Sequence, residues 1–513
     1  MMTYERDRRA GGLVLLAVCS AAVAMPLAFT APAIALPAIG RSLGGTPIAL
    51  NWVTNAFMLG FGSSLMAAGA LADGYGRKRL FVSGTFAFAL VSLALAFVPD
   101  IVCFDLLRAM QGIAAAAAFS GGAAVLAQEF DDASRTRAFS FLGASFGFGL
   151  AFGPIASGVL VEAFGWRSIF LFVIVFTSTA CVLGARALRE SRDPGVLGFD
   201  WPGSLSFTLA LALFTCAILQ GPQSGWSSPW VAVPLLGAAA VFAFFVVIER
   251  RTARPMLDLG LFRYPRFVGV QLLAAAPAYA FVVLLVLLPI RFIGIEAVSE
   301  SSAGWTMLAL SLPLLVLPLF AGWLARWFGV ATICSGGLFV CAAGLLWLSG
   351  FAAGETTPSI MAPVSMIGIG ISLPWGLMDG LAVSVVPTER AGMAAGIFNT
   401  TRVAGEGVAL AAVSALLSTL SAKHLAAGRS LSIASDATAA AQRLVTGDVA
   451  RAIAAFPAAG RSGLVHAYAT AFSTLLVVLA SITALTAVVI ALFLQQAQRG
   501  KETGGIDAVD GAA

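Results

Sequence analysis

Charged side chains are scarce in this 513-residue chain, and their scarcity excludes a water-soluble globule. Asp, Glu, Lys and Arg make up 11% of the residues, whereas hydrophobic residues make up 59%. A soluble domain carries roughly 25% charged residues, because its surface must face water. Soluble enzymes and nucleic-acid-binding proteins are therefore excluded for most of the chain, and we expect no nucleic acid among its partners.

Patterns that hold metals, nucleotides or disulfides are also lacking. The two histidines, His424 and His466, fall in one polar loop, and none of the six cysteines forms a Cys-x-x-Cys pair. These spacings predict no metal site and no cofactor. No Gly-x-x-x-x-Gly-Lys sequence occurs, so ATP is not the expected energy source. Clustered His, Asp or Lys of a membrane-embedded enzyme are missing too, so we expect the chain not to be an enzyme.

Long, continuously apolar runs dominate the sequence and predict membrane-spanning helices. Inside a bilayer only helices or closed barrels satisfy the backbone, and these runs do not alternate as barrel strands do. The first run lacks a charge from Ala10 to Gly40, which indicates a retained helix and not a signal peptide. We predict an all-α integral membrane protein with fourteen spans, over residues 12–37, 50–72, 80–98, 101–127, 138–161, 168–185, 203–220, 229–248, 267–290, 303–325, 330–351, 360–386, 392–419 and 467–494.

Basic residues set the predicted orientation. With the N-terminus inside, the inner segments hold 20 Lys and Arg and the outer loops hold 8. Cytoplasmic loops carry such an excess, so both termini are predicted to be cytoplasmic, in the inner or plasma membrane of the cell. The most basic inner loop, 249–266, is expected to meet the anionic leaflet. The outer loop 420–466 is expected to form one or two short helices near the membrane surface and to act as a structural lid.

A short internal repeat relates the two halves of the chain. Gly69-Ala-Leu-Ala-Asp73-Gly-Tyr-Gly76 resembles Gly322-Trp-Leu-Ala-Arg326-Trp-Phe-Gly329, and each segment closes an apolar span at its inner end. Repeated halves are typical of secondary transporters. The first copy continues as Arg77-Lys78-Arg79, and the whole stretch resembles the inner-loop motif of the major facilitator superfamily, Gly-x-Leu-Ala-Asp-x-x-Gly-Arg-Lys/Arg.

Two further motifs resemble the fourteen-helix drug:proton antiporter family of that superfamily. Arg108-Ala-Met-Gln111-Gly112 is similar to its Arg-x-x-Gln-Gly motif. Gly149-x-x-x-Gly153-Pro154-Ile-Ala-Ser-Gly158 is similar to its antiporter motif, Gly-x-x-x-Gly-Pro-x-x-Gly-Gly. The resemblance implies a major facilitator fold, in which two extra helices separate two six-helix halves. The implied parts are a cytoplasmic N-terminus (1–11), the first half (12–185), the extra helices (203–248), the basic loop (249–266), the second half with its outer loop (267–494) and a cytoplasmic tail (495–513).

The chain departs from the family at two charged positions. Leu27-Ala28-Phe-Thr30 is similar to the family's first-helix signature, Leu-Asp-x-Thr, but Ala28 stands where the family has a membrane-buried Asp. Arg326 replaces the usual acid in the second inner motif. The loss of an acid at Ala28 weakens the argument for a cationic substrate and requires another site for proton coupling.

Five charged residues fall within the predicted spans. A charge in the bilayer costs several kcal/mol unless it is paired or hydrated, so each is a functional candidate. Arg108 follows Asp105 by three residues, so the two can pair, or Arg108 can face a central cavity. Arg402 and Glu406 lie four apart on one helix face, either as a structural ion pair or as a relocated proton site. Asp379 lies toward the inner end of its helix.

These features predict a proton-coupled exporter that works by alternating access. Its partners are a lipophilic small molecule, protons and the lipid bilayer, and its energy source is the proton gradient. The 37 Phe and 12 Met against 5 Tyr suit an apolar, adaptable cavity. A symporter that imports a metabolite and a transport-dead sensor or scaffold remain alternatives, and the sequence leaves open a periplasmic adaptor.

We predict that Asp73 acts in a conformational latch, because it stands in the complete inner-loop motif. Asp73→Asn keeps the shape of the side chain and removes its charge. The variant should be expressed near the normal level and should lower transport strongly, measured as dye accumulation in cells. Transport equal to that of the parent would remove the latch from this account.

Overall fold

The computed structural model describes residues 2–130, 132–192, 200–252, 257, 259–351, 357–386, 391–427 and 434–506, which form helices joined by short turns. In chain order the helical elements are α1 (Met2–Leu43), α2 (Pro47–Tyr75), α3 (Arg77–Ala96), α4 (Ile101–Glu129), α5 (Asp132–Phe164), α6 (Ser168–Ala187), α7 (Trp201–Ser224), α8 (Pro229–Arg251), η1 (Leu259–Arg263), α9 (Pro265–Pro277), η2 (Ala278–Val282), α10 (Val283–Pro289), η3 (Ile290–Ile295), α11 (Glu300–Phe328), α12 (Val330–Ser349), α13 (Thr357–Ser384), α14 (Ala391–Ala426), α15 (Ala434–Val445), α16 (Val449–Ala455), η6 (Pro457–Ala459) and α17 (Gly460–Ile506).

The all-α membrane fold is confirmed. Within the described residues, thirteen segments are long and apolar enough to cross a bilayer, so the chain is a multi-pass membrane protein. The helix α2 covers the predicted span 50–72 but is not among the thirteen, and the count of fourteen stays a prediction. Polar residues lower its hydropathy, and one of them, Asn55, donates from Nδ2 to the Asn51 carbonyl of the same helix at 2.9 Å.

The helices extend beyond several predicted bounds. The segment 1–11, predicted as an N-terminal tail, is helical from Met2 onward, and α17 continues to Ile506 through much of the predicted tail. On the predicted outer side, α14 reaches Ala426 and α17 begins at Gly460, so both helices extend into the predicted loop 420–466. Hydropathy marks where a helix meets lipid, but the hydrogen bonds of a helix continue into water without an apolar run.

The sequence repeat corresponds to a structural repeat. The helix α2 packs on α4 as α11 packs on α13, and α3 contacts α4 and α6 as α12 contacts α13 and α17. A glycine with positive φ lies between α2 and α3, and another lies between α11 and α12: Gly76 at 127° and Gly329 at 75°. Such φ values favour glycine, which has no Cβ, so the repeated glycine makes the tight turn possible.

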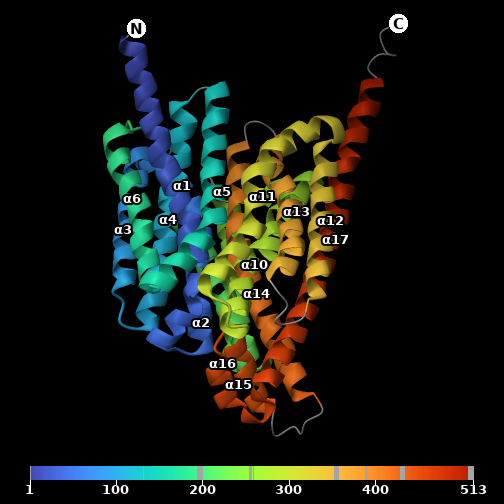
Figure 1. The fold of residues 1–513 in the computed structure, drawn as a ribbon. Helices are drawn as coiled ribbons and strands as arrows, with labels where there is room; N and C mark the ends of the chain where they lie inside the picture. Colours follow the sequence, from blue (N-terminus) through green and yellow to red (C-terminus); the bar gives the residue numbers. More distant parts are fainter. Residues whose placement is uncertain are drawn as a thin grey trace.

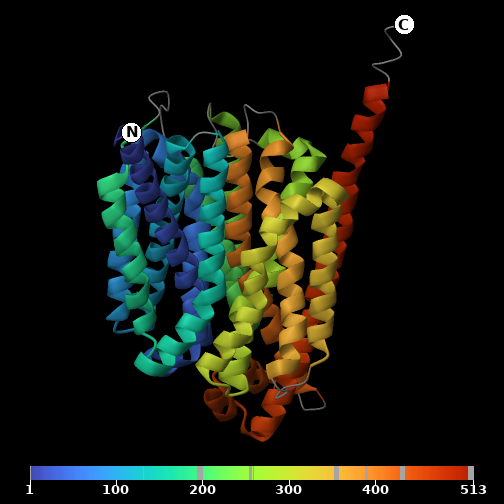
Figure 2. The same ribbon diagram turned by 45° about the horizontal axis from the view of Figure 1, so that its top comes forward.

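The two halves touch through equivalent helices. The helix α5 of the first half packs against α11 of the second half. In the same way α14, the counterpart of α5, packs against α2, the counterpart of α11. Both views show the first half, in blue and teal, beside the second, in yellow and orange (Figures 1 and 2). The described N-terminal end of α1 and the C-terminal end of α17 lie at the same end of the bundle, and α15 and α16 lie at the opposite end (Figure 1). We call that opposite end the outer end, following the predicted topology.

The helices α7 and α8 lie against the junction of the two halves. The helix α7 packs on α8 and also on both α2 and α14, one from each half. The helix α8 is mostly exposed, with Trp230 at 75% and Leu236 at 70%. Large exposed apolar side chains are stable in lipid, so α8 presents this surface to the bilayer.

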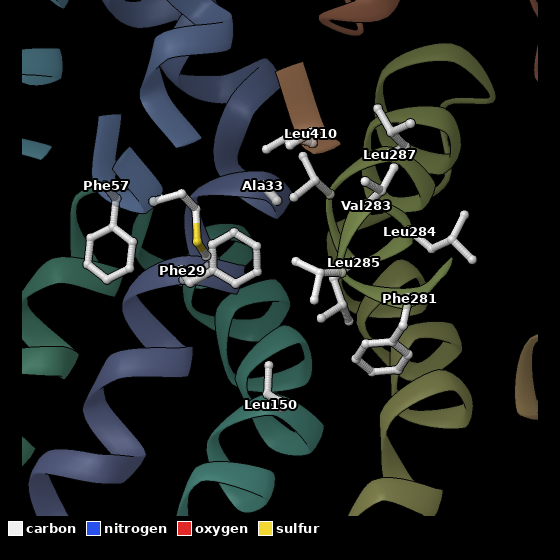
Figure 3. Packing of buried hydrophobic residues seen from close by; sticks show 14 of the residues in the cluster. Phe29, Ala33, Phe57, Leu150, Phe281, Val283, Leu284, Leu285, Leu287 and Leu410 are labelled. Carbon is white, nitrogen blue, oxygen red and sulfur yellow. The ribbon is translucent and has the colours of Figure 1, made fainter. Parts of the chain in front are cut away.

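A continuous but irregular span forms the centre of the second half. It runs from Pro265 to Ile295 through α9, η2, α10 and η3, and it is almost wholly buried. Two π-helical segments begin just after Pro277 and Pro289. A proline lacks the N–H that an α-helix needs, which favours such wide turns. Figure 3 shows its side chains, such as Phe281 and Leu285, opposite Phe29 of α1 and Leu150 of α5.

Two short helices of the predicted outer loop cover the outer end of the bundle. In α15 the apolar face is buried, including Ala440 and Leu444 at 0% exposure. Arg443 of α15 donates from Nη1 to the Gly45 carbonyl between α1 and α2, at 3.0 Å. Burial lowers the pKa of Arg443, and the charge of Arg451 lowers it further. After α15, Gly447 contacts Gly294 of η3, so this segment touches both halves.

We predict that α15 lies outside the cell, where the charge count places it. Ser435 is exposed in its first turn, so Ser435→Cys in a variant lacking the native cysteines should react with an impermeant maleimide added to intact cells. The same residue should be protected in inverted vesicles. Reaction in inverted vesicles alone would reverse the topology.

Candidate substrate cavity between the two halves

A cavity lies where the two halves meet. The first half contributes side chains of α1, α2, α4 and α5, and the second half contributes side chains of η2, α13 and α14. The lining consists of Met25, Pro26, Phe29, Phe57, Met58, Phe61, Phe119, Phe146, Leu150, Val282, Trp375, Arg402, Val403 and Glu406. Six of these fourteen are aromatic and two are methionines, so the wall offers large and adaptable apolar surfaces.

The charges of the cavity come from a single helix. Among the lining residues, Arg402 and Glu406 are the charged ones, and both lie on α14. The Arg402 guanidinium donates from Nη2 to Asn399 Oδ1 at 2.8 Å and lies 5.6 Å from the ring centre of Trp375. In the described part of the chain, no ion pair within 4.0 Å joins Glu406 to Arg402. The two charges therefore share one cavity without direct contact, and the structural ion pair considered for them is not formed.

The backbones of α2 and α14 meet beside these charges. A Cβ added to Gly62 would lie 2.6 Å from the Ala404 Cα, and one added to Gly407 would lie 3.2 Å from the Met58 Cβ. The glycines thus allow α14 to lie against α2, with Arg402 and Glu406 on the side that faces the cavity. A larger residue at Gly62 would force the two halves apart at this level.

Arg108 lies behind the cavity wall and does not face the cavity. It is fully buried, and its Nε donates to the Val53 carbonyl of α2 at 2.9 Å. Its Nη1 donates to Gln111 Oε1, and Gln111 in turn donates to Ser92 Oγ at 2.8 Å. Its guanidinium carbon lies 4.6 Å from the ring centre of Phe57, whose side chain lines the cavity.

The ion pair considered as one alternative for Asp105 and Arg108 is not formed. No ion pair within 4.0 Å joins these two described residues, and Asp105 Oδ1 has no hydrogen-bond partner. The guanidinium points across to α2 instead, because the Val53 carbonyl and the Phe57 ring lie there. Gly112, next to Gln111, permits this contact, since a Cβ added to it would lie 2.7 Å from the Phe61 nitrogen.

The glycines of the antiporter motif pack α5 against two partners. A Cβ on Gly149 would lie 2.6 Å from the Val23 carbonyl of α1, and one on Gly153 would lie 2.7 Å from Thr30 Oγ1. Nearer the outer end, α5 packs against the second half. A Cβ on Gly158 would overlap the Glu300 carbonyl of α11. Pro154 lies opposite Gly304 of α11. Two motif residues, Gly149 and Gly153, therefore pack within the first half, and two, Pro154 and Gly158, pack it onto the second.

The inner-loop motif contacts a glutamate that lies outside the motif. Glu190, after α6, accepts a hydrogen bond from the Arg79 backbone N–H at 3.2 Å and lies beside Gly76. This places a carboxylate at the N-terminal end of α3, where the helix dipole favours it. Arg77 donates from Nη1 to Gln128 at 2.8 Å.

Four predicted site residues remain. Gly69 has open space around it, and Lys78 is half-buried. Asp73 on α2 and Asp379 on α13 lie on described helices, but their side chains fall outside the described part of the chain.

A buried ion pair near the outer end was not foreseen from the sequence. Arg291 Nε lies 2.7 Å from Glu296 Oε1, with side-chain exposures of 3% and 6%. Residues five apart do not pair on an α-helix, where neighbours are three or four apart. The π-helix η3 changes that spacing, as the 3.0 Å bond from the Glu296 N–H to the Arg291 carbonyl shows. The predicted span ended at residue 290, which assigned Arg291 to a loop.

The comparison with known families agrees with this arrangement of repeated halves. The model of the Major Facilitator Superfamily matches residues 16–410. The chain belongs to the major facilitator superfamily. Its members are transporters, so the fold, the central cavity and the inner-loop motif find a common explanation in this family.

Several relatives carry names that refer to drug efflux or resistance. The chain is 31% identical to the multidrug resistance protein Stp of Mycobacterium tuberculosis, over 75% of this chain and 72% of Stp. It is 30% identical to the puromycin resistance protein pur8 of Streptomyces alboniger, over 82% and 84%. Among solved structures, a bacterial homologue of the human lysosomal transporter Spinster matches with a TM-score of 0.65 and 15% identity, covering 94% of this chain and 97% of that chain.

We predict that Gly158 is required for contact between α5 and α11. Glu162 Oε2 accepts from the Ser301 N–H at 3.3 Å, so cysteines at positions 162 and 301 should form a cross-link. Gly158→Val should reduce this cross-link several-fold, because the new side chain overlaps the backbone of α11. Gly143→Val on the same helix meets open space and should leave the cross-link unchanged. An equal loss in both variants would point to a general effect on α5.

Proposed function

We propose that the chain exports lipophilic drugs or similar small organic molecules in exchange for protons, across the inner or plasma membrane. The observation that carries this proposal is the central cavity, which combines an aromatic and methionine-rich wall with one carboxylate. The names of its relatives support drug export, since Stp is a multidrug resistance protein and pur8 a puromycin resistance protein.

The cavity wall favours substrates that are apolar and varied in shape. Phe57, Phe61 and Trp375 offer flat faces, and Met25 and Met58 can change rotamer at small cost. Few polar groups converge on the cavity, so hydrogen-bond geometry selects weakly among substrates. Such a wall gains free energy mainly from buried apolar area, which many unrelated molecules can provide.

Glu406 is the proposed proton-coupling group. Its side chain lines the cavity and is 9% exposed, so a bound substrate would compete for the same space. Apolar surroundings favour a neutral carboxyl, whereas a nearby guanidinium favours the carboxylate. Because Ala28 replaces the acid of the family signature, the apolar run of α1 from Ala10 to Gly40 contains no acid, so Glu406 and Arg402 supply the charge that this cavity needs for exchange.

The exchange is coupled to motion through the contact surfaces of the two halves. Gly158 and Gly304 bring α5 and α11 together at the outer end, and Gly62 brings α2 onto α14 beside Glu406. We infer that release of substrate outward separates the first pair of helices, while protonation of Glu406 favours the return. A ligand shifts such an equilibrium by its difference in affinity for the two states, and the proton acts here as one of the two ligands.

Export and its energy source can be tested in cells. Cells that express the protein should accumulate less Nile red and less puromycin than cells without it. A protonophore should abolish the difference, because it removes the proton gradient while the apolar cavity stays intact. Lower accumulation that persists with the protonophore would contradict proton coupling, and higher accumulation would indicate import.

We predict that Glu406→Gln abolishes proton-driven efflux while substrate binding persists. Glutamine keeps the size of the side chain but cannot release a proton. The measurement is substrate-induced proton release in proteoliposomes loaded with a pH-sensitive dye. Glu406→Asp should retain part of the activity, and Arg402→Ala should shift the pH dependence of transport.

The matched control is Glu129→Gln, an exposed glutamate at the end of α4. It should leave both proton release and efflux unchanged. Proton release by Glu406→Gln equal to that of the parent would move the coupling acid elsewhere, with Asp379 and Asp105 as the next candidates.

A further inference from the structure

A second cavity lies at the outer end, apart from the central one. It is formed by side chains of α2, α7, α14 and α15. None of its lining residues lines the central cavity. Its position is unusual because each wall has a different origin: α2 belongs to the first half, α14 to the second, α7 to the extra helices and α15 to the outer cap.

The walls of this outer cavity combine polar and apolar groups without a charge. Asn51, Ser414, Ser418 and Gln442 line it together with apolar side chains such as Leu219, and none of its lining residues is charged. A charged ligand would find no counter-ion there, and its desolvation would be uncompensated. The cavity therefore suits a neutral molecule that has both a polar and an apolar part.

Two of its polar side chains lack partners. Gln442 is 9% exposed and Ser418 is 5% exposed. Among the described residues, neither Gln442 Nε2 nor Ser418 Oγ has a hydrogen-bond partner. Buried polar atoms in folded proteins are usually satisfied, so unsatisfied ones next to a cavity mark positions where a water or a ligand oxygen binds. The amide nitrogen can only donate, and the hydroxyl can donate or accept, so the matching group is a carbonyl or hydroxyl oxygen.

We propose that the outer cavity binds a small neutral amphiphile, such as an aliphatic alcohol or amide. Its oxygen accepts a hydrogen bond from Gln442 Nε2 and exchanges one with Ser418. Its alkyl part lies against Leu219 of α7. Because the walls come from both halves, the bound molecule contacts the outer ends of α2 and α14 together and stabilises the arrangement in which they are adjacent.

The experiment uses the purified full-length protein and a diazirine analogue of 1-hexanol as the photoreactive probe. Irradiation followed by mass spectrometry of peptides should show saturable labelling near Leu219 and Gln442, reduced by excess 1-hexanol. Gln442→Leu keeps the volume and removes the donor, and it should lower this labelling about fivefold, the effect of one lost hydrogen bond. Leu219→Trp fills the space and should abolish the labelling.

The matched control is Gln271→Leu. Gln271 on α9 is 6% exposed, its amide atoms also lack partners among the described residues, and it lines neither cavity. Labelling of the outer cavity should be unchanged in this variant. Ser418→Ala, a smaller change, provides the same test if Gln442→Leu elutes as aggregate in size-exclusion chromatography.

Three results would overturn the proposal. The first is labelling that rises linearly with probe concentration, which indicates partitioning into detergent or lipid. The second is labelling near Leu219 that is equal in the parent, Gln442→Leu and Leu219→Trp. The third is a complete absence of labelling at the outer cavity, which leaves it as a space for water only. None of these results bears on proton-coupled export from the central cavity.

Discussion

Close contact between helix backbones is the constraint on which the rest of this structure depends. Lipid is as apolar as the helix surfaces, so helices in a bilayer gain little from hiding apolar area from one another. They must pack closely, and glycine makes that possible. Gly62 against Ala404 and Gly158 against Glu300 join the two halves at different levels, and these contacts define both the central cavity and the surfaces that must separate during transport.

The scarcity of charge makes the distribution of the remaining charges informative. The first half supplies an apolar wall, while both charges of the central cavity stand on α14. Arg108 stays within the first half, where the Val53 carbonyl and the Phe57 ring hold it behind that wall. Arg108 thus connects α4 to α2 through both the backbone and Phe57. In the exchange that we propose, these charges on α14 take the place of the acid that the family has at the position of Ala28.

The two extra helices and the outer cap belong to the junction of the halves. The helix α7 contacts α2, α14 and α15, and Arg443 of α15 bonds to the loop between α1 and α2. A movement of one half against the other must therefore change the contacts of both α7 and α15. The sequence indicated that 203–248 and 420–466 stand apart from the repeats, but hydropathy contains no information on which helices they touch.

The sequence by itself determined the class of fold, the positions of most spans, the repeat and the placement of Arg402 and Glu406 on one helix face. Each depends on composition or on spacing along one helix, which local geometry fixes. Tertiary structure alone decided that Arg108 bonds to α2 and not to Asp105, and that Arg291 meets Glu296. The first depends on groups far apart in the chain. The second depends on a π-helical turn, which changes the spacing at which side chains meet.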